Sequence, residues 1–128
     1  MTSPAILVVD DQIGVRKLLE ATLTADGYQV ITAGNGQEAL DCLQGETNFP
    51  SLALVDLRMP VMDGTHTLAA LKERWPKLPV VMMTAVGEVD RETELFQLGA
   101  ACTIGKPFDL QQIRTLVTQL LAGEENRR

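Results

Sequence analysis

Five short apolar runs alternate with helix-length amphipathic segments along this chain, and this alternation is the feature that most constrains its fold. The runs are Ala5–Val9, Tyr28–Thr32, Leu52–Val55, Val80–Met83 and Ala101–Ile104. Four of them are almost continuously apolar, which is typical of strands that are covered on both faces. The run YQVIT alternates more strongly between apolar and polar residues, so we expect it to form an edge strand.

The segments between these runs have helical periodicity. In the first segment, Val15, Leu18, Leu19 and Thr22 have the spacing of one buried helix face. The last segment has an apolar stripe, and Asp109 with Gln112 is a plausible capping pair at its start. The segment Glu88–Leu98 has the weakest helical pattern. Alternating strands and helices predict a doubly wound α/β fold: a five-stranded parallel sheet, (βα)5, with the flavodoxin-like strand order 2-1-3-4-5.

Composition narrows the class of protein. A chain of 128 residues is the length of one domain, and we expect it to span residues 1–122, followed by a polar tail at 123–128. The net charge of −6 argues against direct binding to nucleic acid. No apolar run reaches the length of a membrane span, and the N-terminus lacks the pattern of a signal peptide. Two cysteines without metal-binding spacing fit a cytoplasmic protein.

Polar residues follow four of the five apolar runs, at the ends that a parallel sheet brings to one edge. They are Asp10 and Asp11 after the first run, Asp56 after the third, Thr84 after the fourth and Lys106 after the fifth. In a doubly wound fold, ligands bind beyond the carboxyl ends of the strands. The sequence therefore predicts one site that contains three carboxylates, a hydroxyl and an ammonium group.

This set of groups is suited to phosphoryl chemistry. Clustered carboxylates need a cation, and oxygen-only ligands favour Mg²⁺. Lys106 and Thr84 can stabilise the oxygens of a transferring phosphoryl group, and a carboxylate can be the nucleophile that forms an aspartyl phosphate. The residues alone do not decide between Asp56 and Asp11 as that nucleophile.

The residues after the first strand, and the presence of all the site residues, argue against three other functions. A haloacid-dehalogenase-like phosphatase needs a second acid two residues after its first aspartate, where this chain has Gln12. A flavodoxin-like flavin binder needs a phosphate loop rich in Ser, Thr and Gly after the first strand, and this chain has DDQIG there. A degenerate domain of this kind that only binds partners would lack some of the site residues, all of which are present.

Four motifs carry a specific resemblance: VVDDQ (Val8–Gln12), LVDLRMPVMDG (Leu54–Gly64), MMTAVGE (Met82–Glu88) and GKPFD (Gly105–Asp109). In this order and spacing, the chain resembles the receiver domains of two-component response regulators over residues 5–121. The segment DDQIGVRKLL is also similar to that of stand-alone receivers in phosphorelays of the sporulation type. Receivers attached to transcription activators have similar stretches, so a fragment that regulates a transcription-factor output domain is the alternative.

The resemblance implies a role for each site residue. Asp56 would be the phosphoacceptor, and Mg²⁺, or Mn²⁺ in its place, would bind Asp10, Asp11, Asp56 and the backbone carbonyl of Arg58. Thr84, Lys106 and the backbone amides of Leu57 and Ala85 would contact the phosphoryl oxygens. The Lys106–Pro107 peptide bond would be cis. The protein would not be an enzyme in the ordinary sense, although it would catalyse its own phosphorylation and dephosphorylation.

The resemblance also implies partners. A sensor histidine kinase or histidine phosphotransfer protein would dock on the first helix, and the protein would be a monomer, or a dimer on phosphorylation. The docking residues would be Gln12, Ile13, Gly14, Val15 and Leu18. Arg58 and Val86 would slow loss of the phosphoryl group. Thr103 replaces the aromatic residue that often acts as a switch in the family, so we expect the output to differ.

We expect simpler roles for other polar residues near these motifs. Asp63, before Gly64, is typical of a turn, and His66 has no neighbouring groups that would make it a phosphohistidine.

Overall fold

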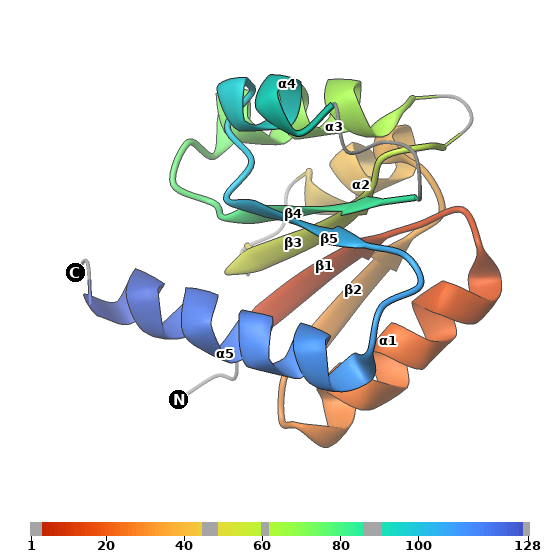
Figure 1. Cartoon of the computed structure of the whole chain (residues 1–128), viewed down its shortest axis with the longest axis vertical. Coiled ribbons are helices and arrows are strands. Elements are labelled where there is room, and N and C mark those ends of the chain that lie inside the picture. The colour runs from red at the N-terminus through yellow and green to blue at the C-terminus, as the bar shows by residue number, and fades with distance from the viewer. Residues whose placement is uncertain (1–3, 45–48, 60–61, 86–90, 127–128) are drawn as a thin grey trace.

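The structure is a computed structural model that describes residues 4–44, 49–59, 62–85 and 91–126. Strands and helices alternate along the whole chain (Figure 1). In chain order they are β1 Ala5–Val9, α1 Ile13–Ala25, β2 Gln29–Ala33, α2 Gly36–Leu43, β3 Leu52–Asp56, α3 Gly64–Arg74, β4 Val80–Thr84, α4 Glu92–Gln97, β5 Cys102–Gly105 and α5 Leu110–Asn126. The predicted alternation is confirmed.

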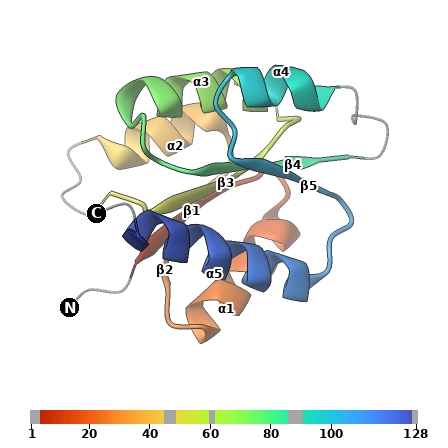
Figure 2. The same cartoon turned by 60° about the vertical axis from the view of Figure 1, so that its left-hand side comes forward.

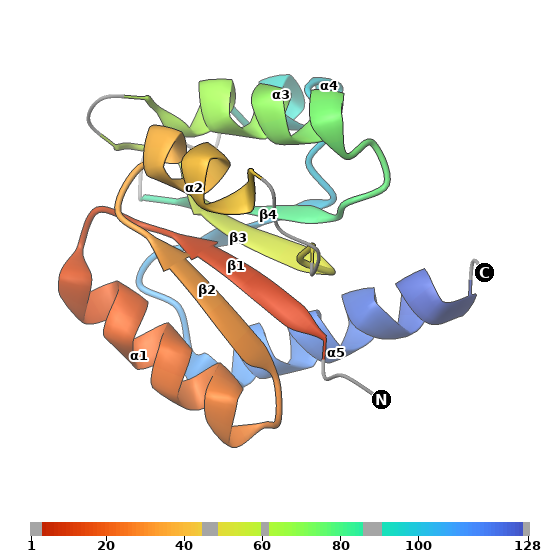
Figure 3. The ribbon, with the colours of Figure 1, turned by 180° about the vertical axis from the view of Figure 1, so that it is seen from behind.

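The five strands form one parallel sheet in the order β2-β1-β3-β4-β5, as predicted. Seen from behind, β2 is the outer strand beside β1, which confirms the expected edge position of the YQVIT segment (Figure 3). The order reverses between β1 and β3, and this switch point is where a doubly wound fold binds its ligands.

The sheet is covered on both faces, with α2, α3 and α4 on one side and α1 and α5 on the other (Figure 2). Alternate residues of each central strand enter the two cores: in β1, Leu7 and Val9 pack toward α2 and α3, while Ile6 and Val8 pack toward α1 and α5. This explains why the central strands read as continuous apolar runs.

Side-chain caps fix the starts of several helices. The Asn35 carboxamide oxygen accepts from the Glu38 amide at 2.8 Å at the start of α2. At the start of α5, Asp109 accepts from the Gln111 amide at 2.9 Å, and the Gln112 side chain accepts from the Asp109 amide at 3.0 Å. The predicted pairing of Asp109 and Gln112 is confirmed by the bond from the Asp109 amide to the Gln112 side chain, and the Asp109 side chain caps the next amide, that of Gln111.

The structure departs from the sequence prediction in three helices. Leu18 is 48% exposed, whereas Leu19 and Leu23 form the buried stripe of α1, so the prediction of a buried Leu18 was wrong. The predicted helix Glu88–Leu98 is α4, which starts at Glu92; residues 86–90 lie outside the described residues. Helix α5 continues to Asn126, so the backbone of the predicted polar tail is helical from residue 123 to 126.

Candidate functional site

The carboxyl ends of four strands converge on the predicted site. Asp10 follows β1 directly, Asp56 and Thr84 are the last residues of β3 and β4, and Lys106 follows β5 directly. Asp10, Asp56 and Thr84 are buried, which is uncommon for such polar groups and calls for specific partners.

Three carboxylates form a compact acidic cluster. One oxygen each of Asp10, Asp11 and Asp56 lies within 4.8 Å of the others. Asp10 and Asp56 are buried, whereas Asp11 is exposed at the rim. An oxygen-only donor set of this kind, open to solvent on one side, fits a hard divalent cation such as Mg²⁺ that retains several of its waters.

Lys106 brings a positive charge into this cluster. Its Nζ lies 2.7 Å from Asp10 Oδ2, 3.4 Å from Asp56 Oδ1 and 3.5 Å from Gln12 Oε1. Its backbone amide donates to the Thr84 carbonyl at 2.6 Å, which fixes the residue at the end of β5. The Lys106–Pro107 bond is cis, as the resemblance implies.

The cluster holds charge at an energetic cost. Burial, reinforced by the negative charge of Asp10 and opposed by Lys106, raises the pKa of Asp56 to about 6. Burial alone would lower the pKa of Lys106, but its hydrogen bond to Asp10 and the charges of Asp10 and Asp56 bring that pKa above its ordinary value. Asp56 is therefore a carboxylate that gains from an added cation.

The backbone around Asp10 is also held. Its amide donates to the Ala33 carbonyl of β2 at 3.1 Å, and its Oδ1 accepts from the Gln12 amide at 2.9 Å. Its carbonyl accepts from Arg16 Nη1 at 2.7 Å. Arg16 was not predicted as a site residue, because the helical pattern of the sequence marks it only as a residue beside the apolar stripe of α1.

Gly64 was also missed as a part of the site. A Cβ atom at this position would lie 2.5 Å from the backbone oxygen of Asp56 and 2.5 Å from Cα of Leu57. The first turn of α3 therefore packs directly on the backbone that carries Asp56, and only glycine allows this approach.

Three of the groups predicted to contact the phosphoryl oxygens lie at the carboxyl ends of β3 and β4. Thr84 Oγ1 is buried near the cluster and donates to the Ile104 carbonyl at 3.5 Å. Ala85 follows β4 directly and is exposed. The Leu57 amide donates to the Met83 carbonyl at 2.9 Å, as a continuation of the pairing between β3 and β4, and its contact with a phosphoryl oxygen stays a prediction.

Thr103 makes a polar link where the family often has an aromatic residue. Its hydroxyl donates to Glu92 Oε1 at 3.1 Å and so ties β5 to the first turn of α4. The structure thus places a hydrogen bond, and not a rotating ring, between these two elements.

The predicted docking residues lie at and before the first turns of α1. Ile13 is 59% exposed and Leu18 48% exposed, Gln12 and Gly14 are exposed, and Val15 is half-buried against the core. The structure therefore brings these residues to the rim beside the acidic cluster.

Of the two residues predicted to slow loss of the phosphoryl group, the structure describes only Arg58. Arg58 is exposed and lines a hollow of about 420 Å³ beside the cluster, together with Leu57, Met59, Asp63 and Arg91. Val86 lies outside the described residues.

Asp63 caps helix α3, which gives its predicted turn role a specific form. Its Oδ1 accepts from the Thr65 amide at 3.0 Å, the Thr65 hydroxyl at 2.7 Å and the His66 amide at 3.2 Å. The hydrogen bond from the Thr65 hydroxyl is the main reason that the pKa of Asp63 lies below its ordinary value. His66 is exposed, and its Nδ1 lies 3.1 Å from the same oxygen.

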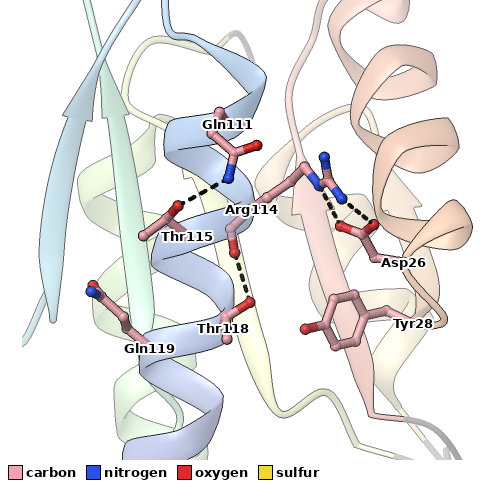
Figure 4. Close-up of a pocket in the computed structure, with 7 residues that line it drawn as sticks. All are labelled: Asp26, Tyr28, Gln111, Arg114, Thr115, Thr118 and Gln119. Carbon is pink, nitrogen blue, oxygen red and sulfur yellow. Dashed lines mark hydrogen bonds and ion pairs between the residues drawn. The ribbon is translucent and has the colours of Figure 1, made fainter.

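A second hollow lies far from the cluster, near the amino ends of the strands. It has a volume of about 430 Å³ and lies between α5 and the segment that contains Asp26 and Tyr28 (Figure 4). Arg114 reaches across from α5 and donates to both oxygens of Asp26, at 2.8 and 2.9 Å. None of the candidate site residues lines this hollow.

Comparison with known proteins decides the family. The family model for the response regulator receiver domain matches residues 6–118. The chain is a response regulator receiver domain. The receiver is 40% identical over 126 residues to sporulation initiation phosphotransferase F of Bacillus subtilis (strain 168), covering 98% of this chain and 100% of that protein.

Other relatives are longer than this receiver. It is 41% identical to the probable transcriptional regulator ycf27 of Cyanophora paradoxa, covering 94% of this chain and 49% of that protein. It is 39% identical to the DNA-binding transcriptional regulator NtrC of Klebsiella pneumoniae, covering 90% of this chain and 24% of that protein. The receiver therefore spans about half the length of ycf27 and about a quarter of the length of NtrC.

Solved structures agree with the fold. A CheY-like response regulator receiver domain protein from Methanospirillum hungatei JF-1 superposes with a TM-score of 0.93 at 26% identity, covering 99% of this chain and 100% of that chain. The receiver domain of NtrX from Brucella abortus gives a TM-score of 0.84 at 29% identity, covering 91% of this chain and 98% of that chain. In the described part of the receiver, no helix has both the length and the apolar character needed to cross a bilayer.

Proposed function

We propose that Asp56 of this receiver accepts a phosphoryl group from a histidine kinase or a histidine phosphotransfer protein in a Mg²⁺-dependent reaction. The observation that carries this proposal is the position of Asp56, between an acidic pair and the Lys106 ammonium group, with a pKa raised to about 6. Asp11 has neither this burial nor contact with Lys106 among the described residues.

The residues that would hold Mg²⁺ are Asp10, Asp11 and Asp56, with the backbone carbonyl of Arg58 as a further ligand. When bound, the ion supplies positive charge to phosphoryl oxygens and to the Asp56 carboxylate. Mn²⁺ has the same preference for oxygen ligands and should substitute.

The chain's own groups account for the rest of the reaction. A carboxylate oxygen of Asp56 forms a bond to phosphorus while the bond from phosphorus to the donor's nitrogen breaks, and the bonding pair leaves with that nitrogen. The Lys106 ammonium and the Thr84 hydroxyl stabilise the negative phosphoryl oxygens, helped by the Ala85 amide. We infer that the receiver promotes its own phosphorylation by these groups, and its own dephosphorylation as well. Because the group that reacts is its own Asp56, we class it as a signalling protein and not as an enzyme.

The donor would dock on the exposed start of α1. Ile13 and Leu18 present two large apolar side chains to solvent, and Gln12 lies between them and the site, 3.5 Å from Lys106 Nζ. A helix on the donor would cover these side chains while its histidine faces Asp56.

We place the receiver in the cytoplasm, as a monomer or as a dimer that forms on phosphorylation. The role that we favour for it is transfer of the phosphoryl group within a phosphorelay. The similarity to the Bacillus phosphotransferase over that protein's full length supports it. The second candidate is regulation of a transcription-factor output domain, which the similarity to ycf27 and NtrC supports. A full reading frame that encodes a DNA-binding segment would favour the second candidate.

Labelling by a small phosphodonor tests the site. We expect acetyl phosphate with Mg²⁺ to add one phosphoryl group by mass, and EDTA to prevent this addition. Asp56→Asn should abolish it, whereas Asp63→Asn, a matched change of a nearby aspartate, should not. Unchanged labelling of the Asp56→Asn protein would refute the assignment.

Comparison of two donors tests the docking surface. Ile13→Asp should lower phosphotransfer from a protein donor and leave labelling by acetyl phosphate intact, because the substitution changes the surface and not the cluster. Phe96→Asp, an exposed aromatic residue on α4, is the matched control and should change neither. Equal loss from both donors in the Ile13→Asp protein would reject the docking role.

A further inference from the structure

The acidic cluster depends on a very short connection. Only Asp11 and Gln12 separate Asp10 from the first residue of α1, Ile13. Asp10 is buried and held by Lys106 and the Gln12 amide. Asp11 is exposed, and its side chain makes no hydrogen bond with the residues that the structure describes. The direction of the Asp11 carboxylate is therefore set by the backbone of this connection.

Arg16 is the side chain that holds this backbone. It is half-buried on α1, one turn after the connection, and its Nη1 donates to the Asp10 carbonyl at 2.7 Å. A charge-assisted hydrogen bond of this length is stronger than a neutral one, and it satisfies a carbonyl that lies beyond the end of β1.

The guanidinium group of Arg16 also lies against the connection between β2 and α2. A Cβ atom added to Gly34 would lie 3.3 Å from Arg16 Nη1 and 3.4 Å from Glu38 Oε2. Gly34 therefore leaves room beside the guanidinium group. A Cβ atom there would already crowd it, and the methyl groups of a branched side chain would add to this crowding and push it away from the Asp10 carbonyl.

We propose that Arg16 is a positioning residue for the divalent cation: by fixing the Asp10 carbonyl, it holds the carboxylates of Asp10 and Asp11 toward Asp56. This inference rests on the proposed function, because it concerns the same acidic cluster. It assigns to Arg16 no contact with the cation or with the phosphoryl group.

The direction in which cation affinity changes when Arg16 is replaced distinguishes a positioning role from a purely electrostatic one. Arg16 carries a positive charge near a site that binds a cation, so its removal should tighten cation binding if charge alone mattered. A positioning role predicts the opposite, because a loosened connection lets the Asp11 carboxylate leave the cluster. Loss of a group that orients metal ligands typically weakens binding by 10- to 100-fold.

The test measures Mn²⁺ binding directly, from the free Mn²⁺ signal in electron paramagnetic resonance. We expect Arg16→Met to raise the Kd about tenfold, and Arg16→Lys to raise it less, because an ammonium can still reach a carbonyl. The matched control is Arg114→Met, which removes an arginine that holds Asp26 far from the cluster and should leave the Kd unchanged. Circular dichroism establishes that each protein is folded at the temperature used.

A second variant keeps Arg16 in place. Gly34→Val should raise the Kd for Mn²⁺ because the added side chain displaces the guanidinium group. The double variant Arg16→Met, Gly34→Val should bind Mn²⁺ no more weakly than Arg16→Met alone, since both changes break the same contact. At saturating Mn²⁺, labelling of Arg16→Met by acetyl phosphate should return to the wild-type rate.

The outcomes separate this inference from the proposed function. A wild-type protein that does not bind Mn²⁺, or binds it as well after Asp11→Asn and Asp56→Asn, would overturn the proposed metal site. A wild-type protein that binds Mn²⁺, with an Arg16→Met Kd that is unchanged or lower, would overturn the positioning role of Arg16 alone.

Discussion

Burial stabilises the folded protein at the middle of a strand and destabilises it at the carboxyl end of the same strand. In β3, Leu52, Ala53, Leu54 and Val55 are fully buried and apolar, and each gains free energy from leaving water. The next residue, Asp56, is also buried, but it carries a carboxylate whose pKa is raised to about 6. One step along the chain thus changes burial from a stabilising to a destabilising contribution.

Strand β1 shows the same contrast. Ile6 to Val9 are fully buried in the two cores, and Asp10, which follows, is fully buried beside Lys106. The sheet therefore stabilises the molecule at its middle and holds unfavourable charges at one end. A charge that is unfavourable in the folded protein is one that a cation or a phosphoryl group can relieve.

The largest effect should come from the middle of the sheet. Leu54→Ala removes a fully buried side chain from the core beside α1 and α5, and we expect it to lower the free energy of unfolding by about 2–5 kcal/mol. Urea unfolding measures this loss, which should be the same with EDTA and with Mg²⁺. A loss below about 1 kcal/mol would show that the strand centre does not carry stability as we describe.

The next effect concerns pH at the end of the sheet. Because the folded protein raises the pKa of Asp56 to about 6, the folded state binds a proton more tightly than the unfolded state. Metal-free stability should therefore fall as pH rises from about 4 through 6, by about 3 kcal/mol from this group.

Asp56→Asn isolates this contribution from those of other titrating groups. The difference in unfolding free energy between Asp56→Asn and wild type, measured in EDTA, should grow in favour of the variant from pH 4.5 to pH 7.5. A difference that is independent of pH would contradict the raised pKa.

A smaller loss of stability should follow from changing Asp63, a carboxylate at the same end of the sheet that caps a helix. Asp63 caps α3, and Asp63→Ala should lower the free energy of unfolding by about 1 kcal/mol. Asp63→Asn retains an oxygen that can accept these hydrogen bonds and should lower it less. Both proteins should be labelled by acetyl phosphate as wild type is; loss of labelling would place Asp63 in the reaction.

The smallest effect should be on the lifetime of the phosphorylated protein. Arg58 has donors only and cannot act as a base for a water that attacks phosphorus, so Arg58→Asn should speed the decay of labelled protein several-fold. Val86→Glu, in the same assay, tests the second predicted residue. Decay rates that equal the wild-type rate in both variants would exclude these side chains as the gate.

The fold and the main site residues could be predicted because they depend on short-range patterns. Continuous apolar runs identify buried parallel strands, and the residue after each run identifies what reaches the carboxyl edge. Asp10, Asp56, Thr84 and Lys106 were all found in this way. The choice of Asp56 over Asp11 needed the family resemblance.

The remaining features depend on tertiary contacts that no local pattern encodes. Arg16 acts on a carbonyl from a different element, and the need for glycine at position 64 arises because α3 packs on the backbone of Asp56. The hydrogen bond of the Leu57 amide to Met83 was not predicted, because the pairing of β3 with β4 continues one residue beyond the strand. Leu18 has the spacing of a buried residue, but the core does not extend under it.

The most direct test of the central claim is the free energy of unfolding of wild type and Asp56→Asn at pH 7.5, each in EDTA and in saturating Mg²⁺. In EDTA the variant should be the more stable protein, by up to about 3 kcal/mol. Mg²⁺ should stabilise wild type and have a much smaller effect on the variant, so that the difference shrinks or reverses. A wild type that is already the more stable protein in EDTA, with an equal response of both to Mg²⁺, would contradict the claim that the sheet holds Asp56 as an unfavourable charge for a cation to relieve.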